Sequence, residues 1–161
     1  MRFFCQGVDQ KQGPACMRRA LEVGLWGSFH NKTPVPPYSN VGNLWIYQQK
    51  GLVIKDSFLF IVQPKNRTFI LGRVISDVIE EFNLVHPWID ISDEPVWGLS
   101  RIDWYTSNIK SMADYGLNFD DHFHGYITMR TPNLKNQLDR HLTYKRVLEQ
   151  IVQEESIKLA S

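Results

Sequence analysis

The stretch Gly24-Leu25-Trp26-Gly27-Ser28 (GLWGS) stands where a predicted helix ends and a loop begins. Residues 15–23 have the apolar spacing of a helix, which Pro14 can open and Gly24 can end. Ahead of that helix, residues 2–8 are short, aromatic-rich and apolar, which predicts a first strand. Residues 30–43 are rich in Pro, Asn, Ser and Gly and predict a loop.

Five more strands are predicted by runs of β-branched and aromatic residues. They span residues 44–48, 57–62, 68–76 (TFILGRVIS), 98–106 (GLSRIDWYT) and 123–130 (FHGYITMR), with a hairpin turn at 64–67 and an irregular segment at 83–98. A closing helix is expected from an N-cap at Thr143, with Val147, Leu148, Ile151 and, at its margin, Val152 on one apolar stripe. The order β-α-β-β-β-β-β-α predicts an α+β fold, a curled mixed β-sheet or partial barrel of about six strands with flanking helices.

Length and composition predict one globular domain. The 161 residues are 43% hydrophobic and 22% charged, and the net charge is only +1. We expect the domain to span residues 1–153 and residues 154–161 to form a tail or the start of a linker. Two cysteines, no apolar run of about 20 residues and no secretory signal predict a cytoplasmic protein without disulfides or a membrane span.

Three motifs resemble the YTH and EVE families of the PUA-like superfamily. The GLWGS stretch, after a first strand and helix, is similar to the Gly-x-Trp-Ser motif of YTH domains. Residues 98–104 (GLSRIDW) look like the YTH strand that reads Phe-Lys-Ile-Asp-Trp. Residues 69–76 (FILGRVIS) are similar to a strand of both families, and Trp26-Gly27 and Leu142-Thr143 to recurring EVE pairs.

The resemblance implies a module that reads a modified base. YTH domains enclose N6-methyladenine in an aromatic cage, and related domains in modification-dependent restriction proteins of the McrB type read modified bases in DNA. We therefore expect a methylated base, flipped out of DNA, to be bound by a domain fused to or associated with an AAA+ motor and a nuclease. Reading of N6-methyladenine in RNA is an alternative, and a protein-interaction module without base recognition is another.

Trp26 and Trp88 are the expected walls of this cage, with Trp97 as a third candidate. Stacking on flat aromatic rings contributes about 1–3 kcal/mol per base. Each tryptophan has an alternative role, Trp26 in the core and Trp88 as an anchor of its loop. Trp26→Ala is expected to abolish the preference for a methylated base while the fold survives. Trp45 and Trp104 lie in predicted strands and are read as core.

Polar contacts to the base and the backbone are predicted from position. Gly27 and Ser28 would present backbone groups to the base edge, since glycine permits close approach. Asp9 and Gln10 end the first strand, roughly where YTH domains keep an Asn or Asp that contacts the base edge, so the resemblance implies them as edge contacts, with solvated turn residues as the alternative. Asp90 is a further candidate. Basic side chains that could contact phosphates are Lys32, Lys55, Lys65, Arg67, Arg73 and Arg101.

An enzyme reading depends on Asp120-Asp121-His122-Phe123-His124. A His-x-His pair beside two carboxylates could hold a divalent metal, but no third ligand stands at an evident spacing. No glycine-rich phosphate loop, nucleophile elbow or His-Glu-x-x-His motif occurs in the sequence. We therefore expect no catalytic residues, no metal and no cofactor.

Overall fold

The computed structural model describes residues 2–29, 55–92, 94–123 and 135–160. Within these ranges the chain forms seven strands, three α-helices and one 3-10 helix. The strands of these described ranges form one mixed, open sheet. This confirms the α+β class. The strand predicted at residues 44–48, and all of the one at 123–130 except its first residue, lie outside the described ranges.

The sheet has the order β1-β3-β4-β6-β2, with β5 added on β6 and β7 on β4. β1 and β3 run parallel, and the other five pairs among the described strands are antiparallel. The strands are β1 (Phe3–Gly7), β2 (Leu25–Phe29), β3 (Phe58–Gln63), β4 (Thr68–Val74), β5 (Glu80–Asn83), β6 (Val96–Trp104) and β7 (Lys110–Ser111). The predicted turn at residues 64–67 is confirmed, because Gln63 and Thr68 are paired across it.

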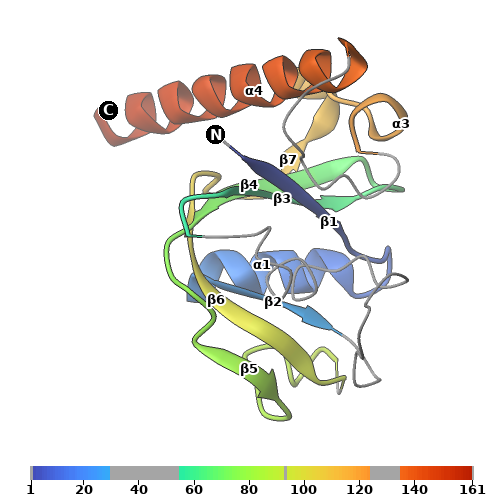
Figure 1. The fold of residues 1–161 in the computed structure, drawn as a ribbon, viewed down its shortest axis with the longest axis vertical. Helices are drawn as coiled ribbons and strands as arrows, with labels where there is room; N and C mark the ends of the chain where they lie inside the picture. The colour runs from blue at the N-terminus through green and yellow to red at the C-terminus, as the bar shows by residue number, and fades with distance from the viewer. Residues whose placement is uncertain (1, 30–54, 93, 124–134, 161) are drawn as a thin grey trace.

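Helix α1 (Gly13–Val23) packs on one face of β1, β3 and β4. As the sequence predicts, Pro14 stands in its first turn, and Gly24 ends it in the left-handed conformation with φ 68°. Its buried residues include Met17 and Ala20. They belong to one core cluster together with side chains of β2 and β6. Figure 1 shows α1 between the β1-β3-β4 layer and the layer of β2, β5 and β6.

Helix α4 (Lys135–Ala160) covers the opposite face of the sheet (Figure 1). Val147, Leu148 and Ile151 are buried there, as predicted, whereas Val152 is 43% exposed. The predicted N-cap at Thr143 is wrong, since the helix begins at Lys135. The Thr143 hydroxyl donates to Asp139 O one turn back, 3.0 Å away, which lets threonine sit inside a helix.

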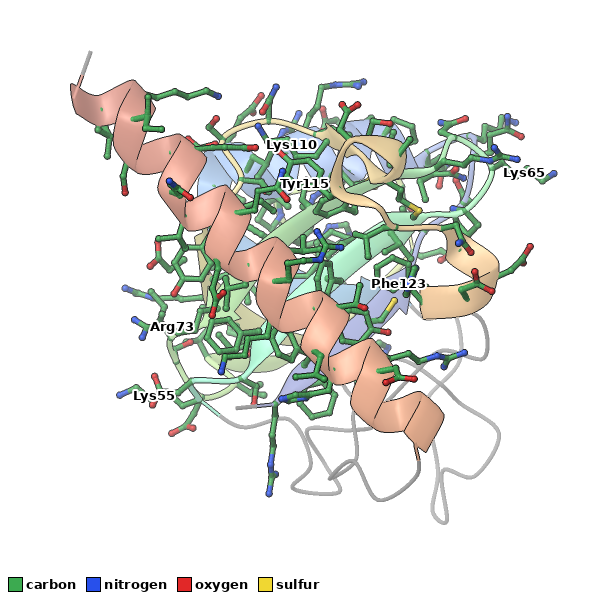
Figure 2. The ribbon with its side chains drawn as sticks, turned by 90° about the horizontal axis from the view of Figure 1, so that it is seen from above. Lys55, Lys65, Arg73, Lys110, Tyr115 and Phe123 are labelled. Atoms are coloured by element: carbon green, nitrogen blue, oxygen red, sulfur yellow. The ribbon has the colours of Figure 1, made fainter. Side chains whose placement is uncertain are left out.

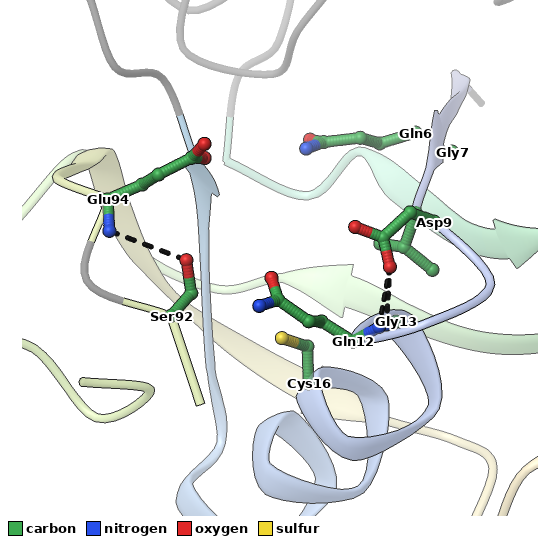
Figure 3. Close-up of a pocket in the computed structure, with 9 residues that line it drawn as sticks. Gln6, Gly7, Asp9, Gln12, Gly13, Cys16, Ser92 and Glu94 are labelled. Carbon is green, nitrogen blue, oxygen red and sulfur yellow. Dashed lines mark hydrogen bonds between the residues drawn. The ribbon is translucent and has the colours of Figure 1, made fainter. Parts of the chain in front are cut away.

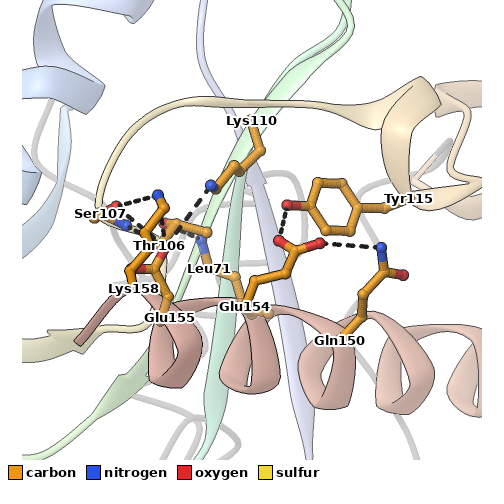
Figure 4. A network of polar contacts seen from close by, with 9 residues as sticks. All are labelled: Leu71, Thr106, Ser107, Lys110, Tyr115, Gln150, Glu154, Glu155 and Lys158. Carbon is orange, nitrogen blue, oxygen red and sulfur yellow. Dashed lines mark hydrogen bonds and ion pairs between the residues drawn. The ribbon is translucent and has the colours of Figure 1, made fainter. Parts of the chain in front are cut away.

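The last two turns of α4 are bonded to the body of the protein. Tyr115 donates to the Glu154 carboxylate at 2.6 Å, and Ser107 donates to Glu155 at 3.1 Å (Figure 4). Lys110 lies 3.7 Å from the same Glu155 carboxylate. Residues 154–160, which belong to the segment expected to form a tail or the start of a linker, lie within this helix.

Two short helices lead from β7 towards α4. They are the 3-10 helix η1 (Met112–Tyr115) and α3 (Phe119–His122). Phe123, predicted to start a strand, instead follows α3 and packs against Phe60 and Tyr144, at 5.3 and 5.7 Å between ring centroids.

No helix in the described ranges is long and apolar enough to cross a membrane.

Candidate functional site

A polar pocket of about 160 Å³ lies where β1 ends and α1 begins. Its lining comes from the end of β1, from the turn and the start of α1 that follow it, and from the segment that precedes β6, which is distant from them in the sequence. Figure 3 shows the side chains directed around one space. The lining residues are Gln6, Gly7, Val8, Asp9, Gln12, Gly13, Cys16, Ser92 and Glu94.

Asp9 fixes the shape of the pocket at the helix start. Its Oδ1 accepts hydrogen bonds from the backbone N–H groups of Gln12 at 2.6 Å and Gly13 at 3.1 Å. A carboxylate there satisfies free N–H groups and favours the positive end of the helix dipole. Of the two polar residues predicted in this turn, Asp9 lines the pocket, whereas Gln10 is exposed and outside the lining.

Trp26 lies directly behind the pocket. Its side chain is fully buried, and its Nε1 donates to Gln6 Oε1 at 3.2 Å. Gln6 is one of the lining residues, so Trp26 is one hydrogen bond away from the pocket space.

Trp88 is also hydrogen-bonded to a residue of the pocket lining, through a backbone carbonyl. It is also fully buried, and its Nε1 donates to Cys16 O at 3.0 Å. The Trp26 and Trp88 rings meet edge to face, with 5.7 Å between centroids and 72° between planes. The predicted pair is thus brought together, but as adjoining core residues. A base cannot stack between two rings that already touch, so the structure corrects the expected role of cage walls.

The remaining residues predicted for the base edge are placed elsewhere. A Cβ on Gly27 would lie 2.4 Å from Val96 Cγ1, so this glycine permits β2 and β6 to pack closely instead of admitting a ligand. Ser28 pairs with Trp97 in the register of these strands. The Trp97 side chain is half-buried, and its ring centroid lies 4.5 Å from that of Phe82. Trp104, read as core, is half-buried and packs against the core cluster on the α1 side of the sheet.

Asp90 is bonded to α1 and does not line the pocket. The Arg19 guanidinium donates to both of its carboxylate oxygens, at 2.8 and 2.9 Å. This hydrogen bonding holds the pKa of Asp90 below its usual range and raises that of Arg19.

His86 forms hydrogen bonds within the segment that leads from β5 to the pocket. Its Nδ1 accepts from Trp88 N at 3.2 Å, and its Nε2 lies 2.8 Å from Glu94 O. The first bond requires an unprotonated Nδ1, which leaves the proton on Nε2 to donate to Glu94. Burial lowers the pKa of His86 and favours this neutral form.

The predicted phosphate contacts divide between two ends of the sheet. Val8 N donates to Val62 O at 2.9 Å, so the turn with Lys65 and Arg67 lies at the pocket end. Lys55 and Arg73 lie at the other end of the same hairpin, and Figure 2 shows Lys65 on the opposite side of the molecule from them. Arg101 pairs with Leu25, beyond the C-terminal end of α1. Lys32 and Trp45 lie outside the described residues.

The chemistry of the pocket is that of hydrogen bonding. Burial, with the nearby Asp9 carboxylate, raises the pKa of the Cys16 thiol to about 11, so it is not a thiolate nucleophile near neutral pH. Among the described side chains, no group of three His, Cys, Asp or Glu is placed to hold a metal ion. His122 belongs to α3 and not to a strand, and His124 lies outside the described ranges.

Of the nine lining residues only Asp9 was predicted from the sequence, and the other eight include the polar side chains of Gln6, Gln12, Ser92 and Glu94. Gln6 is a buried polar residue in a largely apolar strand, and this departure from the apolar pattern could have marked it as a site residue. Gln12, Ser92 and Glu94 stand in polar turns, where the sequence offers no such signal.

No protein-family model matches this sequence, and no curated protein matches it significantly.

Proposed function

We propose that the chain reads a single nucleobase in the pocket between β1 and α1, as a PUA-like module of the YTH/EVE kind. One observation supports this most. Trp26 and Trp88, the two tryptophans that the resemblance selects, each donate a hydrogen bond to a residue that lines this pocket. The buried rings would fix the positions of Gln6 and Cys16 instead of stacking on the base.

Recognition would come mainly from hydrogen bonds to the edge of the base. Gln6 and Gln12 carry both donors and acceptors, and the Glu94 carboxylate accepts hydrogen bonds. The exocyclic amino groups of adenine and cytosine are donors that a carboxylate can accept. A pocket of about 160 Å³ suits one small group, since pockets for drug-sized ligands measure about 300–1,000 Å³.

The ligand we propose is a methylated base in DNA, read for a modification-dependent restriction system with an AAA+ motor and a nuclease. A methylated base in RNA is the alternative. A flipped base costs a few kcal/mol to unstack, and several edge contacts of about 1 kcal/mol each can offset that cost.

The test is a binding screen by fluorescence anisotropy. The probes are DNA and RNA oligonucleotides, each with one N6-methyladenine, 5-methylcytosine, 4-methylcytosine or unmodified base. Gln12→Ala and Glu94→Gln should each weaken the preferred probe about fivefold, as expected for one hydrogen bond. Gln10→Ala is the matched control, because Gln10 stands in the same turn outside the lining. Equal binding of all probes, unchanged by either pocket variant, would refute the proposal.

A protein-interaction surface is a second candidate, favoured by exposed apolar side chains around β5. Phe82, Leu84 and Val85 are 45%, 64% and 80% exposed. Self-association through this surface predicts a molecular mass that rises with concentration in light scattering. Val85→Asp should then restore the monomer mass, and a monomer at all concentrations would count against self-association.

A further inference from the structure

Residues 86–92 form a segment, here called the strap, that crosses from β5 towards the pocket. The strap is compact, because Ile91 N and Ser92 N both donate to Trp88 O at 2.8 Å and Ile89 N donates to His86 O at 3.1 Å. Ser92, at its end, lines the pocket, and its Oγ accepts from Glu94 N at 3.4 Å. The position of the strap therefore sets the position of two lining residues.

One side chain of α1 bonds the strap from outside. The Arg19 guanidinium donates to Pro87 O and to both carboxylate oxygens of Asp90. Such a fork fixes direction as well as distance, since arginine is planar and binds a carboxylate through two parallel bonds. Pro87 and Asp90 stand on either side of Trp88, so the strap is held at two points around its buried tryptophan.

Arg19 supplies a positive charge that the strap and its neighbours in the sequence lack. Residues 74–100 contain no lysine or arginine, and their carboxylates are Asp77, Glu80, Glu81, Asp90, Asp93 and Glu94. A cation that holds the strap must come from another element, and Arg19 supplies it from α1.

We propose that Arg19 is a positioning residue for the pocket, which fixes the strap through Asp90 and Pro87 and so holds Ser92 and Glu94 at the pocket. This inference rests on the proposed function for its ligand, but the fixed strap is a property of the free protein. The Arg19 and Asp90 side chains are 29% and 61% exposed. Exposed ion pairs add little to global stability, so loss of this pair should loosen the strap without unfolding the protein.

The first measurement needs no ligand. Amide hydrogen exchange at Ile91 and Ser92 should accelerate in Arg19→Gln, Arg19→Lys and Asp90→Asn, while the melting temperature stays close to that of the parent. Arg19→Lys keeps the charge and loses the fork, so it separates geometry from charge. Arg18→Gln is the control, since Arg18 is an exposed neighbour on α1. The exchanged pair Arg19→Asp with Asp90→Arg should restore part of the protection.

The second measurement uses a short DNA oligonucleotide with one N6-methyladenine and its unmodified counterpart. If the strap is in place in about a tenth of Arg19→Gln molecules, the apparent Kd for the methylated probe rises about tenfold. Arg18→Gln should bind as the parent does. Unchanged exchange in Arg19→Gln would overturn the fixed strap, and faster exchange with unchanged affinity would overturn its positioning role. Failure of the parent protein to bind any of the DNA and RNA probes of the binding screen would refute the base-reading function and the positioning role with it, while the exchange data still decide whether Arg19 holds the strap.

Discussion

Trp26→Phe should destabilise the protein by roughly 2.5 kcal/mol, because the Trp26 ring is fully buried and hydrogen-bonded. The change removes two buried ring carbons, at about 0.8 kcal/mol each. It also removes the Nε1–H that donates to Gln6 Oε1, and loss of a buried hydrogen bond costs about 1 kcal/mol. Trp26→Ala should cost about 3–5 kcal/mol, so the fold is not expected to survive that change untouched.

The assay is urea unfolding followed by far-UV circular dichroism, which does not depend on tryptophan emission. Trp97→Phe is the matched control, since Trp97 is half-buried on β6, and it should cost roughly 1 kcal/mol or less. A loss below about 0.5 kcal/mol for Trp26→Phe, combined with complete loss of oligonucleotide binding, would refute the reasoning. Trp26 would then be a wall of the ligand site and not a core residue.

Four more outcomes follow from the geometry. Gly27→Ala should destabilise the protein by about 1–3 kcal/mol in the same urea assay, because its Cβ would overlap Val96. Alkylation of Cys16 by iodoacetamide near neutral pH should be much slower than that of a free cysteine, since burial raises its pKa to about 11. Burial lowers the pKa of histidines in the folded protein, so the unfolded chain takes up protons first as the pH drops below about 6.5. The free energy of unfolding should therefore fall with the pH in that range. The described histidines with a lowered pKa are His86, His122 and His141. Lys65→Gln and Arg67→Gln should weaken the binding of plain and methylated DNA alike, and each should reduce the slope of log affinity against log salt concentration by about one. Lys55→Gln and Arg73→Gln, at the opposite end of the hairpin, should change neither the affinity nor the slope.

The parts of the fold that follow local rules could be predicted. The first strand, α1 and the turn at residues 64–67 all have unambiguous signals, such as Pro14 in the first turn and Gly24 at the C-cap. The start of α4 could not be predicted in this way. Thr143 can act as an N-cap, but inside a helix its hydroxyl can instead donate a hydrogen bond to the carbonyl four residues earlier. The sequence does not distinguish the N-cap role from this one.

The site was harder to predict than the fold. The sequence selects Trp26 and Trp88 together, and the structure brings them into contact. It does not tell whether the two rings line a ligand site or are buried in the core, because that depends on the packing of α1, β2 and the strap. Asp90 shows the same limit, since its partner Arg19 stands 71 positions earlier and nothing local connects them.

The parallel pairing of β1 and β3 has a consequence for the order of folding. Phe3 pairs with Phe58, so β1 cannot form this pairing until 55 more residues have been made. At about 5–20 residues per second, that delay is roughly 3–11 seconds. Contacts between distant segments also slow folding after synthesis. Gly7 at the end of β1 and the two residues after it line the pocket, so the pocket can be complete only after β3 and the later lining residues Ser92 and Glu94 have been made.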